Sequence, residues 1–234
     1  MSVKPVCVVV GVGPGNGAAL ARCFAREGYA VALLARRTEL SNKLATELPD
    51  ARAYACDVGN DASVVQTFAA IAKEMGPVDV VAYNAGSGTW GTVEEITPDN
   101  FEAAWRTNAL GLLLVSQQVI PAMKAKGTGA IVVVGATASR RGMPRTTAFA
   151  PAKAAQKSLA EAMAKHVGPM GIHVAIIILD GVVDLERTRQ AMPDKPDEFF
   201  IKPDDVAGTA FWLTHQPRSA WSFEVEARPF GEKW

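Results

Sequence analysis

The sequence predicts an α/β fold in which helices cover both faces of a doubly wound parallel sheet. Six short runs rich in Val, Ile, Leu and Ala alternate along the chain with longer amphipathic segments rich in Ala and Leu. Continuous apolar strands are typical of a parallel sheet that is buried on both faces. The chain has 234 residues, of which 49% are hydrophobic, and it contains no repeat or linker. We therefore expect one domain over residues 1–234.

The strands are expected at the apolar runs, which have the length of buried strands. They are residues 6–10, 30–35, 51–55, 78–82, 130–134 and 173–179, and the weaker run 221–225 is a candidate edge strand. The N-terminal run is too short for a signal-peptide core, and no run reaches the roughly 20 apolar residues of a membrane span. No membrane partner is expected.

The amphipathic segments between these runs predict helices. They are residues 15–27, 38–48, 61–75, 98–126, 146–167 and 203–215. Pro98 and Pro203 each fall in a first helical turn, where the missing N–H costs nothing, and Asp61 is expected to cap its helix. Residues 184–202 have weaker periodicity, so they are interpreted either as a mobile flap over a site or as an ordinary surface excursion.

Charge and cysteine usage limit the classes of partner. Lys and Arg together number 24, as do Asp and Glu, so the formal net charge is zero. This balance gives no reason to expect nucleic acid, whereas a phosphate-bearing small molecule needs only local charge. The Cys and His residues lack disulfide or metal-ligand spacing, so we expect no metal site and a reducing, cytoplasmic location. These residues are Cys7, Cys23, Cys56, His166, His173 and His215.

A glycine-rich turn connects the first predicted strand to the first predicted helix. It reads Gly11-Val12-Gly13-Pro14-Gly15-Asn16-Gly17. Gly11 permits a tight turn, Gly15 lets the backbone approach a pyrophosphate, and Gly17 allows the helix to pack closely on the sheet. The N-terminus of the helix also offers unpaired N–H groups to an anion. The motif indicates a Rossmann-type dinucleotide site, and a plain strand-to-helix turn is the alternative.

A basic pair follows the second predicted strand. Arg36 and Arg37 stand about 25 residues after Gly11, where a dinucleotide fold that prefers NAD places an acidic residue on the ribose 2′-hydroxyl. Two guanidinium groups suit a 2′-phosphate instead, because their charge-assisted hydrogen bonds to phosphate are strong. The pair therefore favours NADP over NAD, and a solvated pair at a helix start is the alternative.

Four further motifs follow the glycine turn in a fixed order. They are Cys56-Asp57-Val58, Asn84-Ala85-Gly86, Asn108 and Lys153. Together with the turn they resemble the short-chain dehydrogenase/reductase family over essentially the whole chain. This resemblance implies an NADP(H)-dependent oxidoreductase that acts on a small-molecule substrate. The implied cofactor-binding residues are Gly11, Gly15, Asn16, Gly17, Arg36, Arg37, Asp57, Val58, Asn84, Ala85, Gly86, Lys153, Gly181 and Val183.

The resemblance also implies individual roles. Asp57 and Val58 would line an adenine pocket, Asn84-Ala85-Gly86 would support the cofactor and the central sheet, and Lys153 would bind the nicotinamide ribose. Lys153 and Asn108 are also the implied catalytic residues. From the residues alone, Asp57 could cap a turn and Asn84-Ala85-Gly86 could form a tight loop. A buried amide at Asn108 needs partners, so a structural hydrogen bond and a water relay are both open.

The resemblance breaks at the catalytic positions. The family's Tyr-x-x-x-Lys reads Phe149-Ala150-Pro151-Ala152-Lys153, and the usual catalytic serine falls on Ala136. Both hydroxyl groups are missing, and a phenyl ring has no proton to donate to a developing alkoxide. Thr137 and Ser139 are the nearby hydroxyls, and Thr137 either points inward or bonds to loop backbone.

A carboxylate and three arginines lie close to this predicted site. Asp180-Gly181 stands where the family commonly has Pro-Gly, so Asp180 is a strand-end cap, a partner of a lysine, or an acid/base group. Arg140, Arg141 and Arg145 follow the fifth predicted strand. They form either a solvated loop or a docking point for a substrate carboxylate or phosphate.

Two functions remain open at this point. The first is an NADP(H)-dependent oxidoreductase that transfers hydride to or from a carbonyl or alcohol with a divergent proton-transfer site. The second is a non-catalytic NADP(H)-binding sensor or interaction protein that kept the fold and lost the chemistry. The long helices 98–126 and 146–167 resemble the paired interface helices of the family, so a homodimer or homotetramer is expected.

Overall fold

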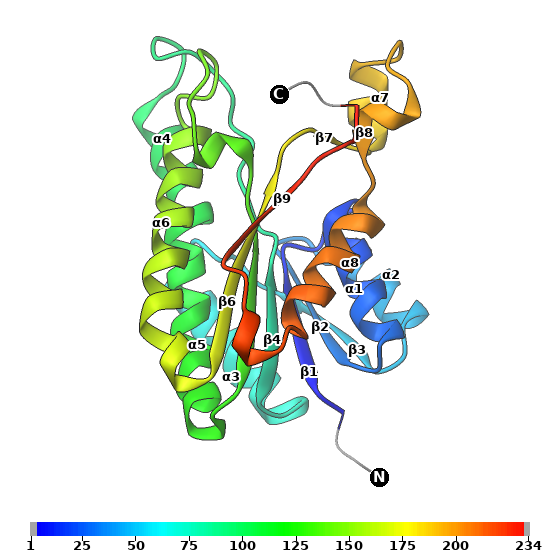
Figure 1. The fold of residues 1–234 in the computed structure, drawn as a ribbon, viewed down its shortest axis with the longest axis vertical. Coiled ribbons are helices and arrows are strands. Elements are labelled where there is room, and N and C mark those ends of the chain that lie inside the picture. The colour runs from blue at the N-terminus through cyan, green and yellow to red at the C-terminus, as the bar shows by residue number, and fades with distance from the viewer. Residues whose placement is uncertain (1–3, 232–234) are drawn as a thin grey trace.

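The computed structural model describes residues 4–231 and contains a seven-stranded sheet (Figure 1). The strand order is β3-β2-β1-β4-β5-β6-β9, and every neighbouring pair is parallel. From β1 the chain builds outward to β3, then returns to β4 on the other side of β1, which confirms the doubly wound fold. The strands are β1 Val6–Val10, β2 Ala30–Ala35, β3 Ala51–Ala55, β4 Val78–Tyr83, β5 Gly129–Val134, β6 Ile172–Leu179 and β9 Glu224–Ala227.

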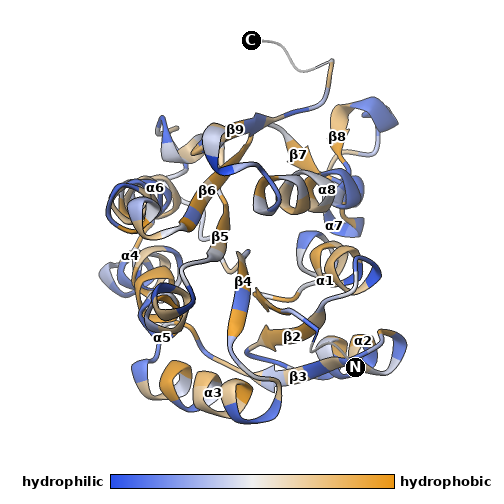
Figure 2. Cartoon of the chain, turned by 60° about the horizontal axis from the view of Figure 1, so that its bottom comes forward, coloured by the Kyte–Doolittle hydropathy of each residue, from blue (hydrophilic) through white to orange (hydrophobic). Residues whose placement is uncertain are grey.

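Helices cover both faces of this sheet, as Figure 2 shows. One layer contains α1 Asn16–Arg26, α2 Glu39–Glu47 and α8 Pro203–Thr214, and the other contains α3 Asp61–Glu74, α4 Pro98–Trp105, α5 Gly111–Lys126 and α6 Phe149–Val167. No helix within residues 4–231 is both long enough and apolar enough to span a bilayer. The expected domain 1–234 includes residues 1–3 and 232–234, which lie outside the described residues.

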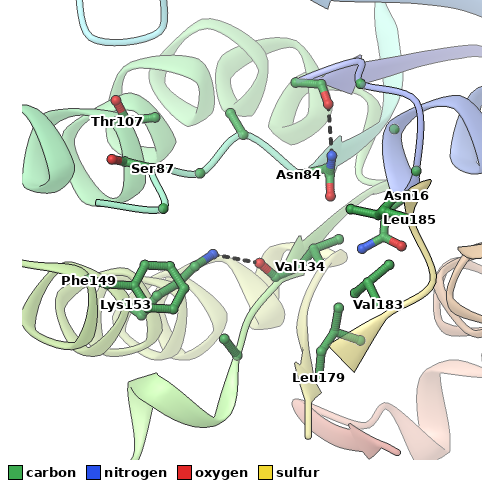
Figure 3. A pocket seen from close by; sticks show the side chains of 18 of the residues that line it. Asn16, Asn84, Ser87, Thr107, Val134, Phe149, Lys153, Leu179, Val183 and Leu185 are labelled. Carbon is green, nitrogen blue, oxygen red and sulfur yellow. Dashed lines mark hydrogen bonds between the residues drawn. The ribbon is translucent and has the colours of Figure 1, made fainter. Parts of the chain in front are cut away.

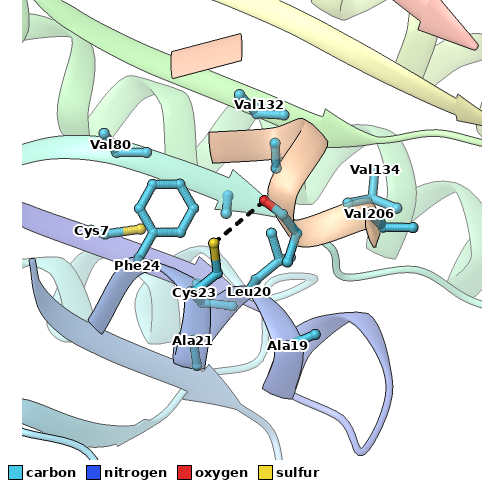
Figure 4. Close-up of a cluster of buried hydrophobic side chains, with 14 of the residues drawn as sticks. Cys7, Ala19, Leu20, Ala21, Cys23, Phe24, Val80, Val132, Val134 and Val206 are labelled. Atoms are coloured by element: carbon cyan, nitrogen blue, oxygen red, sulfur yellow. Dashed lines mark hydrogen bonds between the residues drawn. The ribbon is translucent and has the colours of Figure 1, made fainter. Parts of the chain in front are cut away.

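The core has two large apolar clusters, one on each face of the sheet, and a small third cluster made of Ala104, Ala148 and Ala152. Cys7 and Val9 of β1 belong to the cluster beneath α1 and α8, whereas Val6, Val8 and Val10 belong to the cluster beneath α3, α5 and α6. This alternation follows from the two-residue period of a strand. Figure 4 shows the first cluster, to which α1 contributes Leu20, Phe24 and Cys23. Burial on both faces explains why the strands are continuous apolar runs.

Three sequence expectations need correction. The predicted helix 98–126 is interrupted by a π-helical turn, Arg106–Leu110, between α4 and α5. Asn60, rather than Asp61, caps α3, because the Asn60 side chain accepts a hydrogen bond of 2.9 Å from the Ser63 N–H. The edge strand β9 begins at Glu224 instead of residue 221, and it pairs with the last four residues of β6.

The predicted flap, residues 184–202, contains short secondary-structure elements. It follows β7 Val182–Val183, contains α7 Glu186–Ala191 and ends in β8 Phe200–Ile201, which pairs with β7. Asp184 binds the guanidinium of Arg189 at 2.6 and 2.9 Å and the ammonium of Lys202 at 2.6 Å. The hydrogen bonds of Arg189 and then of Lys202 hold the pKa of Asp184 well below its usual range.

The structure also contains short 3₁₀ helices, which are Thr137–Ser139, Gly168–Met170, Asp197–Phe199 and Arg218–Ala220.

Candidate functional site

A cavity of about 1220 Å³ opens at the carboxyl ends of the strands (Figure 3). It lies where the strand order reverses between β1 and β4, the place at which open α/β sheets bind ligands. All fourteen residues predicted to bind a cofactor line this cavity. The predicted catalytic Asn108 does not line it. The fourteen residues, which were predicted from motifs far apart in the sequence, therefore lie around one cavity.

The glycine turn forms the floor of the cavity and has no room for side chains at two positions. Gly11 has φ +90°, and a Cβ there would lie 2.5 Å from the Ala85 nitrogen. A Cβ at Gly17 would lie 2.5 Å from the Gly11 carbonyl oxygen, because α1 packs directly on the turn. No side chain caps α1. The N–H groups of Ala18 and Ala19 donate to the Gly13 and Gly15 carbonyl oxygens, so the N–H groups of Asn16 and Gly17 are the ones left for an anion.

The turn supports a stability prediction with a matched control. Gly17→Ala is expected to lower the free energy of unfolding by about 1–3 kcal/mol, because the new methyl meets backbone atoms of Gly11 and Val12 that cannot rotate away. Gly13→Ala is expected to change it by less than about 0.5 kcal/mol, since no atom lies within 4 Å of a Cβ there. Urea unfolding of both variants checks this, and equal losses would contradict the packing argument.

Arg36 and Arg37 lie between β2 and α2 and are exposed. Both line the cavity. Within residues 4–231, neither guanidinium has an ion-pair or hydrogen-bond partner. The two groups are therefore free to bind an anion that enters this end of the cavity.

The motifs after β3 and β4 hold the loops at the cavity edge. Asp57 Oδ1 accepts a hydrogen bond of 3.0 Å from the Gly59 N–H, so Asp57 does stabilise its own turn. The Asn84 side-chain amide donates to the Gly11 carbonyl oxygen at 2.8 Å, which joins the end of β4 to the glycine turn (Figure 3). The turn-capping alternative considered for Asp57 is present in the fold, whereas residues 84–86 form no tight turn and Asn84 bonds to the glycine turn instead. Asp57 and Asn84 both line the cavity.

Lys153 points from α6 into the protein, next to the cavity. Its ammonium donates to the Val134 carbonyl oxygen at 3.0 Å and to Gln156 Oε1 at 2.9 Å. The side chain is buried, and loss of hydration lowers the pKa of Lys153 to about 8. Lys153 can donate three hydrogen bonds, so one N–H remains for a ligand.

Gln156 is a functional candidate that the sequence analysis missed. It is fully buried, and its amide also donates to the Asn108 carbonyl oxygen at 3.0 Å. Gln156 thus connects Lys153 to the π-helical turn. A glutamine on the largely apolar inner face of the predicted helix, three residues after Lys153, was the available signal.

Asn108 lies in the π-helical turn and is fully buried. Its side-chain amide donates to the Ala104 carbonyl oxygen at 2.8 Å, which is the structural hydrogen bond expected of a buried amide. Its Oδ1 atom has no hydrogen-bond partner among the described residues. A Cβ at Gly86 would be 3.3 Å from this oxygen and 3.6 Å from Lys153 Nζ, so both polar groups face the same glycine.

Aromatic rings line the cavity beside Lys153. Phe149 packs against Trp90, with ring centroids 5.1 Å apart and planes tilted by 34°. Trp90 is 58% exposed, which is unusual for so large an apolar side chain. Ala136 also lines the cavity. The wall formed by Phe149, Trp90 and Ala136 has no hydroxyl group.

Thr137 directly follows Ala136 in the sequence, and it is the nearest hydroxyl-bearing residue to Ala136 that lines the cavity. Its Oγ1 atom lies 2.6 Å from Asp180 Oδ1 and 3.0 Å from the Leu179 carbonyl oxygen. Asp180 lines the cavity as well. Ser139 Oγ donates to the Ala136 carbonyl oxygen at 2.7 Å and is absent from the described cavity wall. The structure thus separates the two candidate hydroxyls.

The three arginines after β5 do not form one cluster. Arg140 binds Glu224 at 2.5 Å and also binds Glu226, on the β9 side. Arg145 lines the cavity but binds Glu95 at 3.2 Å. Arg141 lines the cavity, and its only described acidic neighbour is Asp180 at 4.0 Å. The three arginines therefore do not form a shared site for a substrate carboxylate or phosphate.

The segment after β7 closes one side of the cavity. Leu185, Arg187 and Thr188 line it, and Leu185 contacts Gly15 of the glycine turn. Arg189 faces away from this wall, where it binds Asp184 and Asp197 and lies over the Phe200 ring at 4.1 Å. The segment borders the site, and its mobility stays a prediction.

The comparisons with known proteins agree with this architecture. A family model described as short chain dehydrogenase matches residues 5–195. The chain belongs to the short-chain dehydrogenase family. A 3-oxoacyl-[acyl-carrier-protein] reductase of Bos taurus is 30% identical over 218 residues, which cover 91% of this chain and 92% of the relative. A farnesol dehydrogenase of Aedes aegypti is 27% identical over 241 residues, covering 98% and 97%.

Solved structures resemble this short-chain dehydrogenase over nearly its full length. An alcohol dehydrogenase of the archaeon Thermococcus sibiricus, complexed with 5-hydroxy-NADP, has a TM-score of 0.86 and 29% identity, covering 98% of each chain. A metagenomic short-chain oxidoreductase in complex with NADP has a TM-score of 0.85 and 25% identity, covering 99% of this chain and 100% of the other. Within residues 4–231 of this short-chain dehydrogenase, no cluster of His, Cys, Asp or Glu could hold a metal ion.

Proposed function

We propose that this short-chain dehydrogenase is an NADP(H)-dependent oxidoreductase that interconverts a small carbonyl compound and its alcohol. The observation that carries the proposal is the cavity at the strand-order reversal, where the glycine turn, Arg36, Arg37 and Lys153 lie together. Two of the similar solved structures contain NADP or a 5-hydroxy derivative of it, which supports the choice of cofactor. NAD is less favoured, because positions 36 and 37 are arginines, whereas a fold that prefers NAD has an acidic residue there.

The cavity residues fit a dinucleotide phosphate. The N–H groups of Asn16 and Gly17 at the start of α1 suit a pyrophosphate, and the unpaired Arg36 and Arg37 suit a 2′-phosphate. Asn16 Oδ1 is buried without a partner among the described residues, as expected of an acceptor that waits for a ligand donor. Asp57 and Val58 are assigned to the adenine. When bound, the cofactor supplies or accepts the hydride at the substrate carbon.

The remaining assignments concern the central sheet and the nicotinamide end. Asn84, Ala85 and Gly86 would support the cofactor and the central sheet. Gly181 and Val183 would border the nicotinamide. Lys153 would donate its remaining N–H to the nicotinamide ribose. Phe149 and Ala136 are taken to stand at the family's tyrosine and serine positions, so the usual proton route is missing.

A non-catalytic NADP(H)-binding sensor is the second candidate, because the Phe149 wall carries no hydroxyl group. NADPH oxidation with a panel of ketones and aldehydes, including acetophenone, and NADP⁺ reduction with the matching alcohols separate the two functions. NADPH binding is measured in parallel by fluorescence. Turnover supports the oxidoreductase. Binding without turnover favours the sensor, and absence of binding would refute both.

Other properties stay predictions. The exposed apolar side chains Phe101, Trp105 and Leu113 on α4 and α5 support a homodimer or homotetramer, because a second copy would cover them. The sparse cysteines, which are all unpaired and buried, support a cytoplasmic location. One shared sheet supports a single domain over residues 1–234.

Lys153→Met is expected to weaken NADPH binding by roughly 10-fold, because it removes a charge-assisted hydrogen bond of about 1.5 kcal/mol. Phe149→Ala is the comparison, and it is expected to act through packing against Trp90 with little change in NADPH affinity. Fluorescence titration measures both. Unchanged NADPH affinity in Lys153→Met would contradict the ribose assignment.

Lys153 also predicts a pH dependence of stability. Its pKa is about 8 in the folded protein and about 10.4 in an unfolded chain. Between these values the unfolded state binds more protons, so the stability of the wild type relative to Lys153→Met should rise as the pH rises from 8 toward 10. Lys165→Met, on the exposed face of α6, should show no such trend. Urea unfolding at several pH values checks both variants.

A further inference from the structure

We propose that Thr137 and Asp180 form the proton relay of this site, with Thr137 as the group that protonates the substrate oxygen. The inference rests on the proposed oxidoreductase function and names a route that replaces the missing hydroxyls at Phe149 and Ala136. Its basis is the short contact of 2.6 Å between Thr137 Oγ1 and Asp180 Oδ1 at the cavity wall.

The position of Thr137 is fixed by neighbouring strands. It follows β5 directly after Ala136 and opens the 3₁₀ helix Thr137–Ser139, while Asp180 follows β6, the strand paired with β5. The backbone N–H of Asp180 donates to the Ala227 carbonyl oxygen at 2.9 Å, which holds the carboxylate at the end of the sheet. Two elements of the rigid sheet therefore set the distance between the hydroxyl and the carboxylate.

Other polar groups at this end of the cavity are less suited to move a proton. Two of the N–H groups of Lys153 already bind acceptors on the protein. The guanidinium of Arg141 stays protonated in proteins. Four other hydroxyl side chains line the cavity, and none of them contacts a described carboxylate: Ser87, Thr107, Thr146 and Thr188. Within the described cavity wall, Thr137 is the hydroxyl that contacts a carboxylate.

The hydrogen bonds of Thr137 provide both halves of a relay. A hydroxyl has one proton and two acceptor positions, so Thr137 donates to only one oxygen at a time. When Asp180 is ionised, the charge-assisted bond to the carboxylate is the stronger one. When Asp180 carries a proton, the carboxyl donates to Thr137 Oγ1, and the Thr137 proton is released toward the cavity or toward the Leu179 carbonyl oxygen.

The proton balance of carbonyl reduction follows from this pair. As the carbonyl carbon is reduced, the substrate oxygen gains negative charge and takes the Thr137 proton. In the structure the Thr137 hydroxyl donates to the Asp180 carboxylate, so solvent must first deliver a proton to Asp180. Thr137 Oγ1 takes that proton from Asp180 in the same event, and Asp180 ends as the carboxylate again. The Asp180 side chain is 21% exposed, and water can therefore return its proton. Alcohol oxidation uses the same atoms in reverse, with Asp180 receiving the proton.

The first test does not depend on turnover. Acetophenone bound together with NADP⁺ cannot be reduced, and the infrared stretching frequency of its carbonyl reports hydrogen bonding to the oxygen. The frequency should be lowered in the wild type and in Thr137→Ser, and it should return toward the free value in Thr137→Val. An equal frequency in all three proteins would overturn the role of Thr137.

The second test follows acetophenone reduction by NADPH. Thr137→Val and Asp180→Asn should each lower kcat by roughly 10²-fold or more, and Thr137→Ser should retain most of it. Formate should restore part of the rate of Asp180→Ala, because a small acid can enter the space and replace the carboxyl, an effect that a structural role of Asp180 would not give. Ser139→Ala removes a neighbouring hydroxyl outside the described cavity wall and should leave kcat unchanged.

The outcomes separate the relay from the proposed function. If the wild type reduces acetophenone and both Thr137→Val and Asp180→Asn match its rate, the relay is refuted while the oxidoreductase function stands. If NADPH binds but the wild type turns over no member of the carbonyl panel, the function fails, and the relay fails with it.

Discussion

Phe149→Tyr combined with Ala136→Ser is expected to raise ketone reduction by roughly 10²-fold in an Asp180→Asn background, within the range that a positioned acid contributes. A tyrosine at 149 would lie one helical turn from Lys153, whose positive charge lowers the pKa of a phenol. In the wild-type background the gain should be smaller, because the proposed relay of Thr137 and Asp180 is intact there. Initial rates with acetophenone and saturating NADPH measure both gains.

Each single replacement serves as a control for the pair. Ala136→Ser alone should give little, since serine is a poor acid, and Lys153→Met should remove most of the gain from the double replacement. Phe149 also packs against Trp90, so the tyrosine must fit the same space. A double variant that is slower than its parent in both backgrounds would show that the aromatic wall, rather than the missing proton donor, limits the reaction.

Replacing Arg36 and Arg37 together by alanine is expected to weaken NADPH binding by roughly 1.5–3 kcal/mol more than NADH binding. This difference corresponds to about 10- to 150-fold in the ratio of dissociation constants. Both guanidinium groups line the cavity without partners among residues 4–231, so no internal ion pair has to be broken before they bind a phosphate. Fluorescence titrations with the two nucleotides provide the ratio.

Arg22→Ala is the control for the loss of a positive charge outside the cavity. Arg22 lies on the exposed face of α1 and pairs weakly with Glu47 at 3.7 Å, so its loss changes net charge without touching the cavity. It should leave the NADPH to NADH ratio unchanged. Equal weakening of both nucleotides in the Arg36/Arg37 variant would overturn the assignment of these residues to a 2′-phosphate.

The strands and most helices could be predicted because burial of the sheet on both faces requires strands that are apolar at nearly every position and helices that are apolar on one face. The run Val6–Val10 is apolar at every position, since alternate residues enter opposite clusters. The boundary errors came from polar residues at element ends. Asn60 and Asp61 are both good capping residues, and only the direction of the Asn60 side chain decides between them.

The cavity lining could be predicted from motifs, whereas the polar contacts beside it could not. Gln156 meets Lys153 within one helical turn, but its second bond, to Asn108, joins residues 48 positions apart. Thr137 and Asp180 are 43 positions apart and meet because β5 and β6 are neighbours in register. Such pairs depend on strand order, which composition and periodicity do not contain.

The π-helical turn makes the placement of Asn108 depend on residue count. A π turn holds more residues than an α turn, and one residue more or fewer rotates the following helix by about 100°. Shortening Arg106–Leu110 by a single residue would allow a regular helix and would turn α4 relative to α5. Asn108 and the carbonyl that accepts from Gln156 would then leave the Lys153 side of the helix. Insertions and deletions here therefore change which residues face Lys153 rather than the length of a loop, and this stretch should tolerate substitutions far better than changes in length.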